Sequence, residues 1–268
     1  MKKRRLIPVL LLRNGWIVQS KRFRKWQPIG NPVTSVKRLS EWASDELIFL
    51  DISRDDTYDL KRDDLATPNR ATILEIIKDA SKQAFMPLTV GGRIRTLEDI
   101  KARLSHGADK VCINTKPLEM PAFIEAAARE FGSQAVVVSV DFSSLEGRLE
   151  VMKHWGMQPT GRCPEAWARE AESRGAGEIL LNSIDRDGMK TGYDLDTTAR
   201  IADAVKIPVI ACGGVGHWDH LAEGLAQTGA DAVAAANIFH YSDQSVFFAK
   251  KRLTESGLDV RPPDLFSF

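Results

Sequence analysis

The sequence predicts an α/β fold, a single-domain (β/α)8 barrel (TIM barrel) made of two similar halves and spanning residues 1–268. Three observations favour it: the order of the elements, an internal repeat and the chain length. Short apolar runs rich in β-branched residues alternate with stretches of helical period, a pattern typical of βα units around a parallel sheet. A chain of 268 residues without a linker has the usual length of one such barrel.

In chain order, the apolar runs indicate eight strands and the periodic stretches indicate eight helices. The expected strands are Leu6–Leu12, Leu47–Ile52, Pro87–Val90, Lys110–Asn114, Ala135–Asp141, Ile179–Ile184, Pro208–Cys212 and Ala232–Ala236. The expected helices are Val33–Trp42, Ala71–Gln83, Leu97–Ser105, Pro121–Phe131, Pro164–Arg174, Leu195–Val205, Trp218–Gln227 and Ser245–Glu255. In such a barrel the loops after the strands form the active site. Two of these loops, 15–32 and 53–69, are long, which is typical of segments that cover or bind substrate.

The repeat relates two segments in the two halves of the chain. Residues 88–115 align with residues 209–237, because the pair Gly91-Gly92 and the triplet at Gly107 (GAD) recur at one fixed offset as Gly213-Gly214 and the triplet at Gly229. Each segment reads strand, glycine pair, helix, GAD, strand. This arrangement predicts a pseudo-twofold enzyme that grips two similar groups, and phosphates are the expected ones.

Charge and composition argue against a nucleic-acid-binding, membrane, disulfide-bonded or metal-binding protein. A net charge of +1 argues against a nucleic-acid partner, because duplex binding usually needs a clustered excess of Lys and Arg. The basic start at 2–5 precedes an apolar run too short for a signal peptide, so we interpret that run as a buried strand and expect no membrane segment. The three cysteines lack CxxC spacing and predict reduced thiols in a cytoplasmic protein. The pair His217 and His220 has no third ligand nearby, so no metal site is expected, and no cofactor.

Long stretches of the chain resemble the cyclase (synthase) subunit family of imidazole glycerol phosphate synthase, over essentially its whole length. They are DELIFLDI at Asp45, GADKVCINT at Gly107, FGSQAVVVSVD at Phe131, RGAGEILLNSIDRDGMKTGYD at Arg174 and IACGGVG at Ile210. The resemblance implies that a class I glutaminase docks on the bottom of the barrel and that ammonia passes up the barrel axis. It also implies a bisphosphorylated substrate across the top face, with one phosphate on each half-barrel.

The resemblance also implies two phosphate sites. The first is formed by Gly92, Asn114 and Thr115, and the second by Asp187, Gly188, Gly214, Ala236 and Asn237. Glycine lets backbone N–H groups approach phosphate oxygens closely. The second site keeps the family pattern better, since Arg93 stands where the family has a third glycine near the first, so we expect phosphate more readily at the second.

The family's chemistry uses two aspartates, at the ends of the first and fifth strands. Asp141 ends the fifth strand and is the expected general acid or base, whereas Leu11 occupies the position of the first aspartate. A leucine can neither take up a proton nor orient a water. Gln19 also stands where a lysine is expected. These changes on the substrate face predict that ring closure is badly impaired.

The bottom face keeps the family's pattern. Four charged residues match the ring through which ammonia is thought to enter the barrel: Arg5, Glu46, Lys110 and Glu178. The alternative is that these residues only plug the barrel bottom with salt bridges, since charge at that face often serves stability. All four charged residues are kept, whereas the first aspartate is lost. This combination favours a conduit, that is, a barrel that still carries ammonia but whose reaction at the top face has changed.

A finer resemblance is to cyclase-like proteins of sugar-acetamidino modification in surface-polysaccharide synthesis, on IPVLLLRNG at Ile7, IGNPV at Ile29 and FMPLTVGGRI at Phe85. It implies that ammonia passes from the glutaminase to a third protein, a sugar amidotransferase. Three alternatives remain open: a working cyclase subunit of histidine biosynthesis, a non-catalytic scaffold that activates its glutaminase, and a sugar-phosphate isomerase of the same barrel type.

Overall fold

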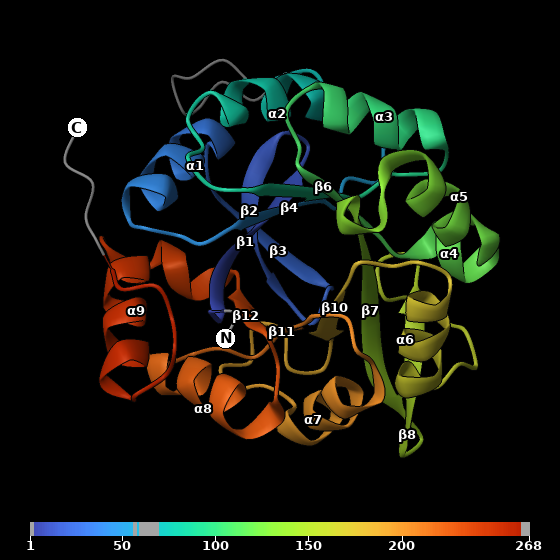
Figure 1. Ribbon diagram of the computed structural model, residues 1–268. Coiled ribbons are helices and arrows are strands. Elements are labelled where there is room, and N and C mark those ends of the chain that lie inside the picture. Colours follow the sequence, from blue (N-terminus) through green and yellow to red (C-terminus); the bar gives the residue numbers. More distant parts are fainter. Residues whose placement is uncertain (1–2, 56–57, 59–69, 264–268) are drawn as a thin grey trace.

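The computed structural model describes residues 3–55, 58 and 70–263. Eight parallel strands form a closed barrel, and Figure 1 shows the helices arranged around it. The (β/α)8 fold predicted from the sequence is confirmed. The barrel strands are β1 (Arg5–Arg13), β4 (Leu47–Asp51), β5 (Leu88–Gly91), β6 (Lys110–Ile113), β7 (Val136–Leu145), β10 (Glu178–Ser183), β11 (Val209–Cys212) and β12 (Ala232–Ala235).

Pairing between β7 and β10 closes the ring of strands. Glu178 lies opposite Val137 and Ser183 lies opposite Phe142 in parallel register, while β1 pairs with β12 on one side and β4 on the other. Because all eight strands run the same way, their first residues gather at one end of the barrel and their last residues at the other. We call these ends the bottom and the top.

The helices lie between successive strands, close to their predicted bounds. They are α1 (Pro32–Glu41), α2 (Ile73–Ser81), α3 (Leu97–Ser105), α4 (Thr115–Glu119), α5 (Ala122–Phe131), α6 (Pro164–Ser173), α7 (Leu195–Ala204), α8 (Trp218–Thr228) and α9 (Ser245–Glu255), with 3-10 turns η1 (Ser133–Ala135) and η2 (Asn237–His240). α2 begins after the predicted start at 71 because Thr72 caps it, its side chain accepting a hydrogen bond from the Glu75 amide, and it ends at Ser81 rather than at 83.

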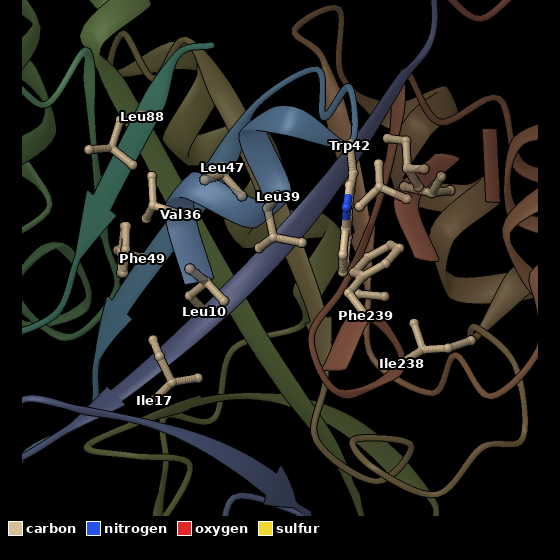
Figure 2. Packing of buried hydrophobic residues seen from close by; sticks show 14 of the residues in the cluster. Leu10, Ile17, Val36, Leu39, Trp42, Leu47, Phe49, Leu88, Ile238 and Phe239 are labelled. Atoms are coloured by element: carbon tan, nitrogen blue, oxygen red, sulfur yellow. The ribbon is translucent and has the colours of Figure 1, made fainter. Parts of the chain in front are cut away.

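Alternation along the strands divides the core into layers. In β1, Leu10 and its outward-facing neighbours belong to the layer between barrel and helices, whereas Ile7 and Val9 fill the barrel interior. Figure 2 shows Leu10 and Phe49 beside Val36 of α1 in the outer layer. The interior layer is apolar and includes small side chains on β12.

Two hairpins, which the sequence analysis did not predict, are added at the top. Strands β2 (Trp16–Lys21) and β3 (Lys25–Gly30) follow β1, and the turn between β1 and β2 places Asn14 and Gly15 at positive φ. This is the Asn-Gly signal of a two-residue hairpin turn. Strands β8 (Arg148–Lys153) and β9 (Gln158–Pro159) extend β7 in the same way. The predicted long loop 15–32 is therefore mostly an ordered hairpin.

Most of the second long loop lies outside the described residues, as do residues 264–268 of the C-terminal tail. No helix in the described ranges is long and apolar enough to cross a membrane.

Candidate functional site

A cavity of about 460 Å³ opens at the top of the barrel. Its lining combines the ends of several barrel strands with the two added hairpins. The strand residues include Leu11, Leu50, Ser139, Asp141 and Asn182, and the hairpin residues include Ser20, Phe23, Trp26, His154 and Trp155. The cavity thus lies where the loops of a (β/α)8 barrel place their chemistry.

Asp141 lies in this cavity with two polar partners. The Ser139 hydroxyl donates a 2.7 Å hydrogen bond to Oδ1 of Asp141, and Asn182 also forms a side-chain hydrogen bond with the carboxyl group. Burial raises the pKa of Asp141 to about 6, against the effect of these hydrogen bonds, and the nearby Asp187 adds to the rise. A carboxyl group with this pKa can give or take a proton near neutral pH.

Leu11 supplies no second acid. Its side chain lines the same cavity and belongs to the apolar cluster of the barrel interior, with Val18 of β2. Leu11 also pairs in register with Leu50 of β4, which lines the cavity as well. At the level of Leu11 and Leu50 this side of the cavity is therefore apolar, and β1 brings no carboxylate to face Asp141.

Asp51, at the end of β4, is a buried acid that sequence reasoning did not single out. Its Oδ2 accepts a 2.9 Å hydrogen bond from the Tyr58 hydroxyl, and its Oδ1 accepts one of 3.0 Å from the Ser53 amide. Arg93 Nη1 lies 3.6 Å from Oδ2. Burial and the Asp51 charge raise the pKa of Tyr58 well above its ordinary value. The signal was available, because Asp51 lies near the end of an apolar strand-like run, as Asp141 does.

The first predicted phosphate site borders the cavity. Gly92 has a φ of +94°, and a Cβ there would lie 2.1 Å from the Asp51 carbonyl oxygen, so only glycine fits. The Asn114 side-chain amide donates to the carbonyl oxygens of Ser139 and Met152, at 3.1 and 3.2 Å. These contacts hold Asn114 against β7 and β8.

Thr115 is tied to the hairpin that extends β7. Its hydroxyl donates to Oδ1 of Asn114 at 3.3 Å and accepts a 3.2 Å hydrogen bond from the His154 amide. Arg93, Arg95 and Lys116 add three cationic side chains to the cavity lining near these residues.

The second predicted phosphate site is occupied by the chain itself. The Ser20 hydroxyl donates a 2.7 Å hydrogen bond to Oδ2 of Asp187, and the Asn237 amide donates one of 2.8 Å to the Ser20 carbonyl oxygen. Gly214 lies against Gly192, whose amide donates to the Gly214 carbonyl oxygen at 2.8 Å. The β2–β3 hairpin therefore covers the half-site at which we expected phosphate more readily. Ala236 immediately precedes η2 in the same region.

The four charged residues at the bottom form a closed ring of ion pairs. Lys110 Nζ lies 3.1 Å from Glu46 and 2.8 Å from Glu178. Arg5 Nη1 lies 2.7 Å from Glu46 Oε2, and Arg5 Nη2 lies 2.8 Å from Glu178 Oε1. The second contact is an ion pair whose angles do not fit a hydrogen bond. Thr89 of β5 completes the set with a 2.7 Å hydrogen bond to Glu46.

Burial separates this charge ring from an ordinary surface salt bridge. The Glu46 and Glu178 side chains are 2% and 9% exposed, and those of Arg5 and Lys110 are 16% and 18% exposed. Although burial opposes it, the charges of Arg5 and Lys110 lower the pKa of Glu178. Glu178 is therefore held in its ionised form.

Aromatic rings and cations surround the mouth of the cavity. The Arg13 guanidinium lies 4.4 Å from the centroid of the Trp26 ring. Arg54 lies between Trp26 and Trp155, at 5.7 and 5.9 Å from their rings. Such contacts place flat apolar surface beside positive charge. Across residues 3–55, 58 and 70–263, no group of three or more His, Cys, Asp and Glu side chains is arranged to hold a metal ion.

Comparison with known protein families decides the relationship. The family described as "Histidine biosynthesis protein" matches residues 5–245, which covers the barrel strands, Asp141, the charge ring and both half-sites. The chain belongs to the histidine biosynthesis protein family. Membership agrees with the family-level resemblance found in the sequence. Leu11 and Arg93, where the sequence analysis expects a departure from the cyclase subunit, both line the top cavity.

Proposed function

We propose that this chain is the barrel subunit of a glutamine amidotransferase complex. A class I glutaminase docks on the bottom, ammonia enters through the charge ring, and the nitrogen reaches an acceptor other than the bisphosphate of histidine biosynthesis. Histidine biosynthesis family members often act with partner subunits. The charge ring is the observation that carries the proposal.

Closing the barrel bottom with four buried charges carries a large desolvation cost. Replacing a buried ion-pair network by apolar residues of similar volume is often neutral or stabilising, so stability alone gives little reason for four charges there. A ring of donors and acceptors does suit the passage of a small polar molecule, because ammonia can exchange hydrogen bonds with Glu46, Glu178 and Lys110 in turn. This is the reason to prefer a conduit over a plug.

The barrel interior above the charge ring suits neutral ammonia. Ile7, Val137 and Leu180 lie in this interior layer, together with Ala232 and Ala234 of β12. An ammonium ion would lose its hydration there at a large cost, whereas neutral ammonia would not. The two alanines leave more room on the β12 side than larger residues would.

Among the acids that line the top cavity, Asp141 is the one we propose as the acid or base. With a pKa of about 6, Asp141 is mainly ionised at neutral pH and can accept a proton as nitrogen adds to an acceptor. Leu11 provides no partner for the two-aspartate chemistry of the cyclase. The acceptor we propose is an N-acetylated sugar bound at the top cavity. Ammonia adds to its acetamido carbon and the amide oxygen leaves as water, which gives the amidine, with a third amidotransferase above the barrel.

A second candidate is a non-catalytic scaffold that only activates the glutaminase. The completeness of the ion pairing favours it, because every member of the charge ring contacts two oppositely charged partners. A scaffold would stimulate glutamine hydrolysis but release the ammonia to solvent.

The experiment is co-expression with the glutaminase encoded beside this chain, followed by purification of the complex and measurement of glutamine hydrolysis. We expect a stable complex at micromolar concentration, with glutaminase turnover raised in it. Lys110→Met, which removes the charge and keeps the length, should disturb coupling between hydrolysis and product formation. Lys78→Met, at an exposed position on α2, is the matched control. The absence of any complex would refute the proposal.

A further inference from the structure

The β2–β3 hairpin folds back over one half of the barrel top. β2 runs antiparallel to β1, with Leu11 opposite Val18, and β3 runs antiparallel to β2. In Figure 1 both strands are seen within the ring of barrel strands. The hairpin tip reaches the loop after β10, where the Arg22 amide donates a 3.0 Å hydrogen bond to the Asp187 carbonyl oxygen.

The contacts of this hairpin engage the side chains of Asp187 and Asn237 in the second half-site. Oδ2 of Asp187 accepts hydrogen bonds from the Ser20 hydroxyl at 2.7 Å and from the Phe23 amide at 3.2 Å. The Asn237 side-chain oxygen accepts a 3.3 Å hydrogen bond from the Ser20 amide, and the Asn237 side-chain nitrogen donates a 2.8 Å hydrogen bond to the Ser20 carbonyl oxygen. A phosphate needs donors, whereas Asp187 offers an acceptor that the hairpin already satisfies.

The hairpin backbone also fills the space beside Gly188. A Cβ on Gly188 would lie 2.4 Å from the Ser20 carbonyl oxygen, so the two backbones are in direct contact. Ser20 is 3% exposed and Asp187 is 8% exposed. Neither Asp187, Gly188 nor Asn237 lines the top cavity. The hairpin backbone therefore takes the space beside Gly188 that a phosphate group there would need.

The other half-site faces the cavity and is rich in positive charge. Gly92 and Thr115 line it together with Arg93, Arg95 and Lys116. Two carboxylates close to them line the cavity as well: Asp51 lies 3.6 Å from Arg93, and Glu119 contacts Lys153, which is not in the lining, at 3.0 Å, so the three cations outnumber them. This end of the cavity therefore presents the charge that an anionic group needs.

We infer that the ligand of the top cavity carries one phosphate-like anionic group, bound at the Gly92 and Thr115 end, rather than two. Its uncharged remainder extends past Asp141 toward the rings of Trp26 and Trp155. A sugar monophosphate has this chemistry. The inference rests on the proposed function only in treating the top cavity as the acceptor site.

The test is calorimetric titration of the chain alone with inorganic phosphate, fructose 6-phosphate and fructose 1,6-bisphosphate. We expect one phosphate ion per chain, and a bisphosphate affinity within about tenfold of the monophosphate affinity, because the second phosphate gains no charge-assisted hydrogen bonds. Two phosphate ions per chain, a bisphosphate that binds about a hundredfold more tightly, or no binding of any of the three would overturn the inference.

Two variants locate the anion. Arg93→Gly suits the positive φ of this position (+55°) and removes only the side chain. It and Lys116→Ala should each weaken phosphate binding by about tenfold, the usual size of a charge-assisted contact. Lys206→Ala, an exposed lysine at the bottom of the barrel, is the control for loss of one positive charge. Unchanged affinity in both Arg93→Gly and Lys116→Ala would contradict the assigned position.

These measurements need neither glutaminase nor ammonia, so the two proposals can fail separately. A chain that binds one phosphate but forms no glutaminase complex keeps the inference and loses the conduit. If the complex couples glutamine hydrolysis to product formation but the chain binds two phosphates, the conduit is kept and the inference is lost.

Discussion

The Ser20 hydroxyl donates a 2.7 Å hydrogen bond to the buried carboxyl group of Asp187, across 167 residues of sequence. This contact ties the β2–β3 hairpin to the loop after β10. It turns a loop that could have moved freely above the barrel into part of the barrel top, and it decides which half-site the cavity reaches.

Ser20→Ala should loosen the hairpin, because Asp187 loses a donor in a buried setting, at a cost of about 1–3 kcal/mol in the free energy of unfolding. Hydrogen exchange of the β2 and β3 amides should become faster. The matched control is Ser143→Ala, which removes a 2.8 Å serine–aspartate bond to Asp185 at an exposed site. Equal exchange in wild type and Ser20→Ala would show that the hairpin does not depend on this bond.

Lys110→Met should destabilise the fold by on the order of 3 kcal/mol, since it leaves two buried acids with Arg5 as their remaining cation. An exposed ion pair would cost only about 0–1 kcal/mol. Urea unfolding measures the difference. The double variant Lys110→Met with Glu178→Gln should recover part of the lost free energy of unfolding. If Lys110→Met lowers this free energy no more than Lys78→Met does, the charge ring contributes no more than ordinary surface ion pairs.

Asp141→Asn should stabilise the protein at pH 8. Because the pKa of Asp141 is raised to about 6 from 3.8, the folded chain holds this proton more tightly than the unfolded chain. Its contribution to stability is present below about pH 4 and lost as the pH rises through about 6. The stability advantage of the variant should therefore grow between these values to about 2–3 kcal/mol. A difference independent of pH would contradict the raised pKa.

With ammonium and the bisphosphate substrate of histidine biosynthesis, the purified chain should show little or no cyclase activity. Loss of one positioned acid or base typically removes on the order of 10²- to 10⁴-fold of rate. Leu11→Asp should not restore it, because the hairpin still covers the second half-site. Turnover close to that of an authentic cyclase, in wild type or in Leu11→Asp, would identify a working cyclase.

The barrel was predictable because its signals are local. Each predicted strand is a short apolar run, and the third helix, Leu97–Ser105, has the predicted ends. The main difference is β7, which continues to Leu145 beyond the predicted end at Asp141 because it pairs with β8. The resemblance placed Asp141 in the top cavity and the charge ring at the bottom, because barrel topology fixes where strand ends lie.

The covering of the second half-site was not predictable in the same way. It depends on contacts of Ser20 with Asp187 and Asn237, which are far apart in sequence. Asn14-Gly15 is a local sequence signal for the hairpin turn, but no local signal gives the direction in which the hairpin folds over the barrel. The Asp51 contact with Tyr58 depends likewise on a residue outside the strand.

The most direct test of the conduit uses labelled nitrogen. The complex of this chain, its glutaminase and the sugar amidotransferase would receive amide-¹⁵N glutamine with excess unlabelled ammonium, and the amidine product would be analysed by mass spectrometry. The conduit predicts that most product nitrogen carries the label, and that Lys110→Met lowers this fraction whereas Lys78→Met does not. Product nitrogen that matches the solvent ammonium in the wild-type complex would contradict passage through the barrel.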